Sequence, residues 1–376
     1  MQFGLIGKPN VGKSTFFTAA TLKDVEIADY PFTTIQPNVG MSHVRVKCPH
    51  TELGGECNPR KGGCFSGTRF VPIELYDVAG LVQGAHQGKG LGNKFLDDVR
   101  RAKVLLMVVD ASGRTDKEGN HGEGNPVEDV KFVADEFDKW VEGITKKLLG
   151  NKAGTVEEIL LEDLSGLEID KDAILKAIEA AHPTTDTLGF ARALRQFGKP
   201  MVIVANRVDL DGSDPWLKDL EKLGVPVIPT SSATEMLLRK AAEKGFIDYV
   251  PGASTFKILR EGSPQQKNAL EFARQLLKKY GSTGVQQALD KAAFDVGKQI
   301  PVFPVEDENK WVDGNGNLLP DCLLVRQGIT AKEVAYAVHT DIGDKFVKAI
   351  DGKTKQAHGA DYEVQAGDIL KISTRR

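Results

Sequence analysis

The stretch GKPNVGKS at residues 7–14 decides the fold of this chain. It fits the pattern G-x-x-x-x-G-K-[S/T] in every fixed position. An apolar run at residues 3–6 predicts a strand before it, and residues 15–21 follow with helical character. A strand, a glycine-rich loop and a helix in this order are the context that a phosphate-binding loop requires. We therefore expect this loop to hold the phosphates of a nucleotide.

The residue types of the loop predict what each part does. Consecutive backbone N–H groups and the start of the helix are suited to bind phosphate oxygens. Lys13 would place a positive charge on the β and γ oxygens, and the hydroxyl of Ser14 would bind Mg²⁺. Lys13 is therefore also a candidate catalytic residue. The candidate nucleotide contacts in the loop are Gly7, Lys8, Pro9, Asn10, Val11, Gly12, Lys13, Ser14 and Thr15.

Two further segments carry residues that a GTP-hydrolysing site needs. YPFTTIQPN at residues 30–38 supplies a switch threonine, and we select Thr34 to close onto Mg²⁺ and the γ-phosphate. DVAG at residues 77–80 ends an apolar run. Asp77 can bind the metal through water, and the N–H of Gly80 can meet the γ-phosphate. On its own, the threonine segment would be an ordinary loop.

A third segment predicts the base. NRVD at residues 206–209 follows the apolar run MVIVA. The carboxylate of Asp209 suits the two adjacent N–H donors of guanine, which adenine lacks, and a site built on such paired bonds rejects the other base strongly. Arg207 stands where lysine is usual and keeps the charge and a flat surface for stacking. The other candidate contacts to the base are Asn206, Ser231, Ser232 and Ala233.

The apolar runs predict an α/β fold. Residues 71–77, 104–110, 201–205 and 225–230 each predict a strand. The run VLLMVVD at 104–110 is apolar enough to be buried on both faces of a parallel sheet. Strands that alternate with helices indicate a doubly wound P-loop domain, which we assign to residues 1–116 and 196–235.

Residues 117–195 interrupt this alternation and predict a helical insertion. Helical spacing over 127–149 puts one set of apolar residues on a single face: Val130, Val133, Phe137, Val141, Ile144 and Leu148. A second helix is predicted over 172–181. The segment holds 10 Lys and Arg against 17 Asp and Glu, a net charge of −7. A solvated insertion is the preferred interpretation, and an arm that binds a partner is the alternative.

The remaining chain predicts two more parts. Residues 236–300 form a helical extension, with helices over 265–280 and 284–298. Its 11 Lys and Arg against 6 Asp and Glu give a net charge of +5. Such a charge usually marks a solvated face, but this is where we would first look for RNA contact.

Residues 301–376 predict a compact β-grasp-like module. Strands are expected over 302–305, 323–325 and 367–372, the last after a turn. A helix is expected over 330–339, with Thr330 as N-cap and Glu333 completing a capping box. No group of residues in this module suggests catalysis.

Composition excludes several classes of protein. The chain has 376 residues, 27% of them charged, and a net charge of −3, which is ordinary for a soluble globular protein and does not suggest DNA binding. No apolar run reaches membrane-spanning length, and the N-terminus lacks a signal-peptide pattern. We therefore expect a cytoplasmic protein without membrane contact.

Three of the four cysteines lie in one Gly- and Pro-rich segment. Cys48, His50, Cys57 and Cys64 match the ligand set of a structural Cys₃His zinc site. Their spacing lacks the C-x₂-C pairs of strong zinc motifs, so reduced free thiols are the alternative. Cys322 lies outside this segment, and we expect it to be a buried residue with no special role.

Together these motifs resemble a known family. GKPNVGKSTFF, YPFTTIQPN and DVAGLVQGAHQGKGLGNKFL resemble Obg-related P-loop GTPases of the translation-factor class, in particular the archaeal form of the YchF/Obg-like branch. HTDIGDKFVKAIDG and AGDIL resemble a TGS domain. The resemblance spans nearly the whole chain. It implies a nucleotide switch that hydrolyses slowly and associates with the ribosome or its RNA. We also expect the protein to be a monomer.

The resemblance leaves the nucleotide and the mode of action open. Bacterial and eukaryotic YchF-like proteins are known for preferring ATP, with a base motif that ends in Glu. Here it ends in Asp209, which favours GTP, and ATP is the alternative. A nucleotide-dependent RNA-binding adaptor with vestigial hydrolysis is the third hypothesis.

The resemblance also bears on catalysis. Members of this group carry a hydrophobic residue, here Leu81, in place of the Gln that orients water. In some relatives the residue matching Asn10 helps to hold K⁺ beside the phosphates, although an asparagine here can also be a simple turn former. His86 lies in a glycine-rich loop and could approach the attacking water, or be an ordinary surface residue.

Overall fold

The computed structural model describes residues 1–21, 34–36, 39–78, 99–151 and 154–375. The chain divides into two compact units. Of the described residues, the first unit comprises those within 1–21, 34–42 and 74–292, and the second comprises those within 43–73 and 293–375. Residues 43–73, which the sequence analysis grouped with the P-loop domain, thus cluster with the C-terminal part of the chain.

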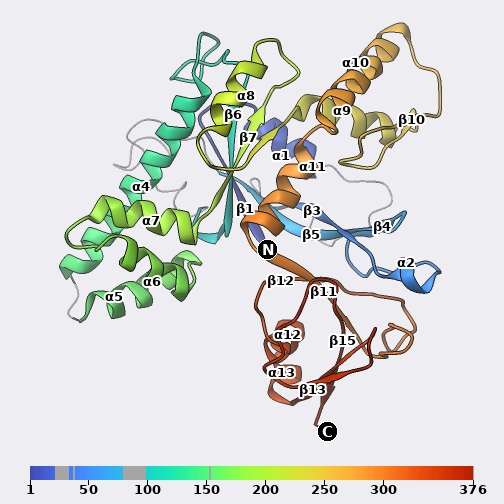
Figure 1. The fold of residues 1–376 in the computed structure, drawn as a ribbon. Helices are drawn as coiled ribbons and strands as arrows, with labels where there is room; N and C mark the ends of the chain where they lie inside the picture. The colour runs from blue at the N-terminus through green and yellow to red at the C-terminus, as the bar shows by residue number, and fades with distance from the viewer. Residues whose placement is uncertain (22–33, 37–38, 79–98, 152–153, 376) are drawn as a thin grey trace. The chain divides into compact units, whose positions relative to one another are not determined.

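The first unit is built on a mostly parallel sheet with strand order β2-β3-β5-β1-β6-β7-β8 (Figure 1). The pairs β5–β1, β1–β6, β6–β7 and β7–β8 are parallel, and β2–β3 is antiparallel. Helices cover this sheet, so the predicted α/β class is confirmed. The strands are β1 (Gln2–Ile6), β2 (Thr34–Gln36), β3 (Val39–Lys47), β5 (Thr68–Asp77), β6 (Val104–Asp110), β7 (Met201–Asn206) and β8 (Val227–Pro229). The sequence analysis did not anticipate β2 and β3.

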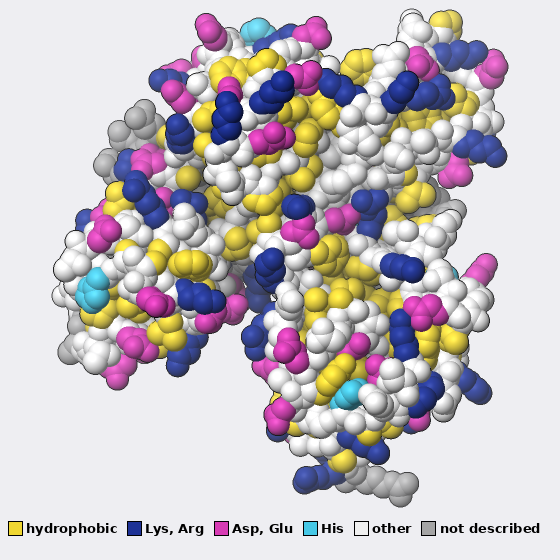
Figure 2. Space-filling view, in the orientation of Figure 1, with side chains coloured by type: hydrophobic (Ala, Val, Ile, Leu, Met, Phe, Trp, Pro, Cys, Tyr) yellow, Lys and Arg dark blue, Asp and Glu magenta, His cyan; other side chains and the backbone are white. Residues whose placement is uncertain are grey.

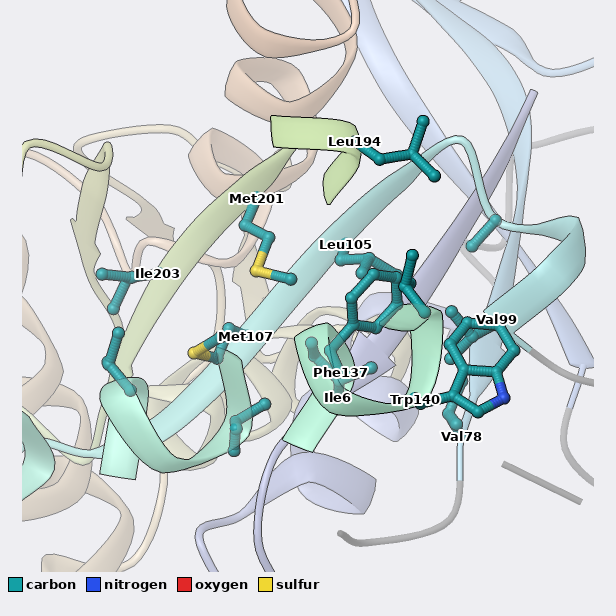
Figure 3. Close-up of a cluster of buried hydrophobic side chains, with 14 of the residues drawn as sticks. Ile6, Val78, Val99, Leu105, Met107, Phe137, Trp140, Leu194, Met201 and Ile203 are labelled. Carbon is teal, nitrogen blue, oxygen red and sulfur yellow. The ribbon is translucent and has the colours of Figure 1, made fainter. Parts of the chain in front are cut away.

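The core of the first unit lies between the sheet and the helix α4 (Pro126–Asn151). Phe137 and Trp140 pack edge to face, with ring centroids 5.5 Å apart (Figure 3). In the view of Figure 3, the Phe137 ring points toward Leu105 of β6, and Trp140 points toward Val78 and Val99. Every residue of β6 is buried, as its apolar sequence predicted, because a parallel strand in the middle of a sheet is covered on both faces.

The predicted insertion forms a helical layer. Val130, Val133, Phe137 and Val141 of α4 are buried, so the expected apolar face is confirmed. The further helices are α5 (Val156–Leu164), the 3₁₀ turn η2 (Ser165–Leu167), α6 (Lys171–Ala180) and α7 (Thr187–Gly198). Helix α7 packs against both α4 and α6. The layer is therefore part of the main core rather than a detached arm.

The rest of the first unit includes the predicted basic extension at residues 236–300. Helices α1 (Lys13–Thr21) and α8 (Ser213–Glu221) precede it in the chain. The extension itself holds most of α9 (Ser232–Glu243), then β9 (Ile247–Asp248), β10 (Lys257–Ile258), α10 (Pro264–Tyr280) and α11 (Val285–Asp290). The helix expected over 284–298 ends early, at Asp290, and a π-helical turn, η3 (Lys291–Val296), replaces its second half. Over α9 and α10, Figure 2 shows basic and acidic side chains interspersed. Three exposed basic residues of α10 are in ion pairs: Lys267, Arg274 and Lys279.

The second unit contains a five-stranded sheet of order β12-β11-β15-β13-β14. Its strands are β11 (Gln299–Val305), β12 (Leu323–Arg326), β13 (Phe346–Asp351), β14 (Ala357–His358) and β15 (Ile369–Thr374). Helix α12 (Ala331–Val338) begins at Thr330 with the predicted capping box to Glu333, and α13 (Thr340–Asp344) follows. The predicted β-grasp-like module is confirmed. Residues 43–73 add α2 (His50–Leu53) and β4 (Gly63–Phe65), which pairs with β5.

None of the described helices combines the length and the apolar composition that a membrane span requires.

Candidate functional site

The predicted site residues gather where the parallel strands end. In open α/β sheets, ligands bind at the carboxyl ends of the strands. The phosphate-binding loop follows β1, while Asp77 ends β5, Asp110 ends β6 and Asn206 ends β7. A cavity of about 890 Å³ opens at this edge. It is lined by Lys8, Pro9, Asn10, Gly12, Lys13, Ser14, Thr15, Arg114, Thr115, Gly119, Asn120, His121 and Arg207.

Close backbone packing fixes the phosphate-binding loop. Gly12 has φ +91°, and a Cβ there would lie 2.2 Å from Nδ2 of Asn206. A Cβ on Gly7 would lie 2.5 Å from the carbonyl oxygen of Val108. Any larger residue at either position would push the loop out of place, so both glycines are required by geometry.

Lys13, Ser14 and Asp77 form one polar cluster at the cavity. The ammonium of Lys13 pairs with Oδ1 of Asp77, and the hydroxyl of Ser14 donates to Oδ2 at 2.9 Å. Mg²⁺ prefers such hard oxygen donors. These two side chains therefore suit a Mg²⁺ ion that Ser14 would bind directly and Asp77 would bind through water.

Asn206 joins two loops of the site. Its Nδ2 donates to the carbonyl oxygen of Val11 at 3.0 Å. Its Oδ1 accepts from the backbone N–H of Ser232 at 3.2 Å and from the Ser232 hydroxyl at 2.9 Å. Ser231 caps α9 by accepting from the N–H of Thr234. Because Asn206 is fully buried, its side chain serves to hold the phosphate loop against the loop after β8.

Arg207 is held by the phosphate loop and by β6. Its guanidinium donates to Oδ2 of Asp110 at 2.7 Å, to Oγ1 of Thr115 at 3.1 Å and to the carbonyl oxygen of Asn10 at 2.7 Å. Burial raises the pKa of Asp110, but hydrogen bonds from Ser112 and Thr115 and the charge of Arg207 outweigh it and leave the pKa below its usual range. These three bonds therefore hold the guanidinium of Arg207, the residue that stands in place of the usual lysine, in one plane.

Lys8 points away from the ligand side of the loop. Its ammonium is buried and donates to the carbonyl oxygens of Thr115 at 2.9 Å and Asp116 at 2.7 Å. It also pairs with Asp129 of α4 at 2.7 Å. Burial raises the pKa of Asp129, and the Lys8 charge opposes that shift. Lys8 therefore offers a ligand only its backbone.

Residues 111–124 contribute part of the cavity, which the sequence analysis missed. The side-chain amide of Asn10 donates to the carbonyl oxygen of Gly119 at 2.9 Å, and Asp116 accepts from the N–H of Asn120 at 2.7 Å. These bonds fold the segment over the phosphate loop and bring Arg114 and His121 to the cavity. The available signal was a Gly-rich run directly after a strand, at the edge where ligands bind.

The other predicted site residues lie away from this cavity or are not among the described residues. Asp209 is half-buried and lines a separate hollow of about 330 Å³ with the start of α8 and part of α10, while Ala233 is exposed in the first turn of α9. The backbone of Thr34 begins β2, but its side chain is not described. Gly80, Leu81 and His86 lie outside the described residues.

The predicted zinc ligands come together in the second unit. One ligand atom from each of Cys48, His50, Cys57 and Cys64 lies within 4.8 Å of the others. All four cysteines lie among the described residues, and none of them forms a disulfide bond.

Models of three protein families match this chain. A model described as a 50S ribosome-binding GTPase matches residues 2–139. A model described as the G4 motif-containing domain of YGR210-like Obg-like GTPases matches residues 204–307, and the TGS domain model matches residues 314–374.

The similar proteins cover the full length of the chain. An uncharacterized GTP-binding protein of Methanocaldococcus jannaschii is 47% identical, over 99% of this chain and 98% of its own. The ribosome-binding ATPase YchF of Escherichia coli O157:H7 is 25% identical, over 98% of both chains. The crystal structure of a GTP-binding protein from Pyrococcus horikoshii OT3 aligns over the whole of both chains, with a TM-score of 0.79 and 37% identity. The structure of the Schizosaccharomyces pombe YchF GTPase shares the fold, with a TM-score of 0.57 and 21% identity over 99% of this chain and 97% of its own.

Proposed function

Because this chain belongs to the YchF/Obg-like family of P-loop GTPases, we propose that it is a Mg²⁺-dependent switch that hydrolyses GTP and acts on ribosomes. The observation that carries the proposal is the cluster of Lys13, Ser14 and Asp77 at the mouth of the phosphate loop. A lysine charge, a hydroxyl and a carboxylate are the groups that phosphoryl transfer from a nucleoside triphosphate requires.

Each group has a defined part in this proposal. The N–H groups of the loop bind the phosphate oxygens, and Lys13 offsets the charge that develops on the transferred phosphoryl group. Ser14, Asp77 and the switch residue Thr34 would hold Mg²⁺, which would neutralise charge on the phosphates. The N–H of Gly80, a residue outside those described, would meet the γ-phosphate. The four candidate zinc ligands belong to the second unit, so they are no part of the nucleotide-binding unit.

The attacking water needs a partner other than Leu81. A leucine side chain cannot form a hydrogen bond with water. His121 lines the phosphate cavity, and an imidazole can orient water or accept its proton at neutral pH. Asn10 also lies there, and its amide oxygen is suited to hold K⁺. The left-handed backbone of Asn10 (φ 61°) and its bond to Gly119 are equally those of a turn former.

We expect His121→Ala to lower kcat for GTP about 100-fold, within the range for loss of a general base. His86→Ala is the matched comparison, because it removes the same side chain from the other candidate position. Turnover at saturating GTP and K⁺ distinguishes them. A loss in His86→Ala with normal turnover in His121→Ala would transfer the role to His86.

Ribosome association rests on the relatives. The Escherichia coli relative is named a ribosome-binding ATPase, and the model matching residues 2–139 describes a 50S ribosome-binding GTPase. The basic extension at 236–300 is the candidate RNA-contacting segment. Because Lys267, Arg274 and Lys279 are already in ion pairs, they add little to a positive field at this surface.

We expect slow GTP hydrolysis by the isolated chain and faster hydrolysis when ribosomes and K⁺ are added. The physical reason is that a partner can complete a site whose own water-orienting group is weak. Phosphate release, with and without ribosomes, measures this. Nucleotide-dependent ribosome binding without any turnover would instead favour the adaptor hypothesis, and turnover restricted to ATP would favour the ATPase.

A further inference from the structure

We propose that Cys48, His50, Cys57 and Cys64 bind one zinc ion, which fastens the loop between α2 and β4 to the end of β3 and to β4 within the second unit. The four ligands come from four places in one short segment of the chain. Cys48 follows β3, His50 begins α2, Cys57 lies in the loop, and Cys64 lies in β4. A metal ion that binds all four would therefore close the whole segment from β3 to β4.

The separations between ligand atoms match tetrahedral zinc. With Zn–S of about 2.3 Å and Zn–N of about 2.05 Å, tetrahedral angles place two sulfurs about 3.8 Å apart, and a sulfur and a nitrogen about 3.6 Å apart. Sγ of Cys48 lies 3.8 Å from Sγ of Cys57. Sγ of Cys64 lies 3.6 Å from Nδ1 of His50. The widest pair of the four lies within 4.8 Å, and a closure of about 1 Å by side-chain rotation completes the tetrahedron.

The alternatives fit less well. A disulfide requires two sulfurs about 2.05 Å apart, far closer than the 3.8 Å between Cys48 and Cys57. Three thiolates and one imidazole form a donor set typical of zinc, whereas the common iron–sulfur clusters take four cysteines. The site is also partly shielded, since Cys48 is fully buried and the other three ligands are half-buried.

A buried arginine supplies the charge that such a site would need. Zinc with three thiolates and a neutral imidazole carries a single net negative charge. Arg69 is only 1% exposed, and its guanidinium points at Sγ of Cys57 from 3.9 Å. Its other bonds go to the carbonyl oxygens of Leu319 and Pro320, and no carboxylate among the described residues pairs with it. A buried cation without a carboxylate is costly, and an anionic metal cluster beside it explains its position.

The same loop is docked on the C-terminal module. The N–H groups of Asn58 and Arg60 donate to the carbonyl oxygens of Leu318 and Pro320, both at 2.9 Å. The guanidinium of Arg60 pairs with Asp313 at 2.6 Å, a contact that also belongs to the second unit. The loop itself contributes few buried apolar side chains, so zinc would supply the order that a hydrophobic core supplies elsewhere.

Elemental analysis of the full-length protein, purified without chelator, tests the proposal. We expect about one zinc per chain, reduced to below about a tenth in Cys57→Ser, because a three-ligand site binds far less tightly. Cys322→Ser is the matched control, because Cys322 is the one cysteine that lies outside the cluster. This variant should keep the zinc. Absence of zinc from the wild type, or zinc retained in Cys57→Ser and lost in Cys322→Ser, would overturn the assignment.

Two further measurements do not depend on the folding of a variant. Wild-type protein loaded with Co²⁺ should show the absorption bands of tetrahedral cobalt bound by thiolates, and an octahedral spectrum would contradict the geometry. Trypsin should cleave after Arg60 or Lys61 faster once zinc has been removed by a chelator. An unchanged cleavage rate would contradict the fastening role. Neither readout involves nucleotide, so failure of the proposed GTPase activity would leave both tests valid.

Discussion

Lys13→Ala should lower kcat/KM for GTP at least about 1,000-fold. Loss of one neutral donor to a developing oxyanion already costs about 100- to 1,000-fold in rate, and Lys13 carries a full charge. The side chain lies on the cavity and supplies the positive charge of the cluster that it forms with Ser14 and Asp77. Phosphate release at a range of GTP concentrations measures the loss.

The control is Lys176→Ala, which also breaks a lysine–aspartate pair. Lys176 pairs with Asp172 at 2.7 Å on the exposed face of α6, away from the cavity residues. Exposed pairs contribute only about 0.2–1 kcal/mol to stability, so this variant should fold and hydrolyse GTP normally. Wild-type turnover in Lys13→Ala would refute the assignment of residues 7–14 as the phosphate site.

Asp209→Asn should weaken GTP binding about 100-fold and create affinity for xanthosine triphosphate. The carboxylate is proposed to accept hydrogen bonds from N1–H and from the 2-amino group of guanine. Hydrogen bonds to a charged group contribute about 1.5–3 kcal/mol each, so weakening both costs about 3 kcal/mol. Xanthine carries an oxygen in place of the 2-amino group, and an asparagine amide can donate to that oxygen while accepting from N1–H.

Competition binding among GTP, ATP and xanthosine triphosphate measures this preference. Wild-type protein should prefer GTP to ATP, because adenine offers the carboxylate only one suitable donor. Asp211→Asn is the control: it makes the same change two residues later, at an exposed position in the same loop. Equal affinity of the wild type for GTP and ATP would support the ATPase alternative. An unchanged base preference in Asp209→Asn would mean that Asp209 does not read the base.

The sequence predicted several local elements of the fold well. Strand β6 has the bounds and the complete burial that its seven-residue apolar run predicted. The capping box from Thr330 to Glu333 is present in both directions. Both depend on residues within a few positions of one another, where spacing alone determines which side chains face the same way.

The sequence was least informative where the role of a residue depends on a distant partner. Residues 7–14 predicted that Lys8 contacts the nucleotide, but they did not show that its ammonium pairs with Asp129, 121 positions away, which leaves only its backbone for that contact. Arg207 was expected to offer a flat surface for stacking, and the sequence did not show that its guanidinium is held by Asp110, 97 positions earlier. Helix 284–298 was predicted too long, because a local pattern does not show where a π-helical turn interrupts it.

By itself, the sequence determined that a strand, a glycine-rich loop and a helix form a phosphate site, and that the motifs occur in the order that a P-loop GTPase requires. Only the tertiary structure decided which side chains complete the site. It placed residues 111–124 over the phosphate loop, joined Asn206 to Val11 across 195 positions, and put Arg69 beside Cys57. The reason is physical: backbone conformation is set mostly by neighbouring residues, whereas a buried charge or amide must find its partner wherever the packing of the sheet and helices brings one near.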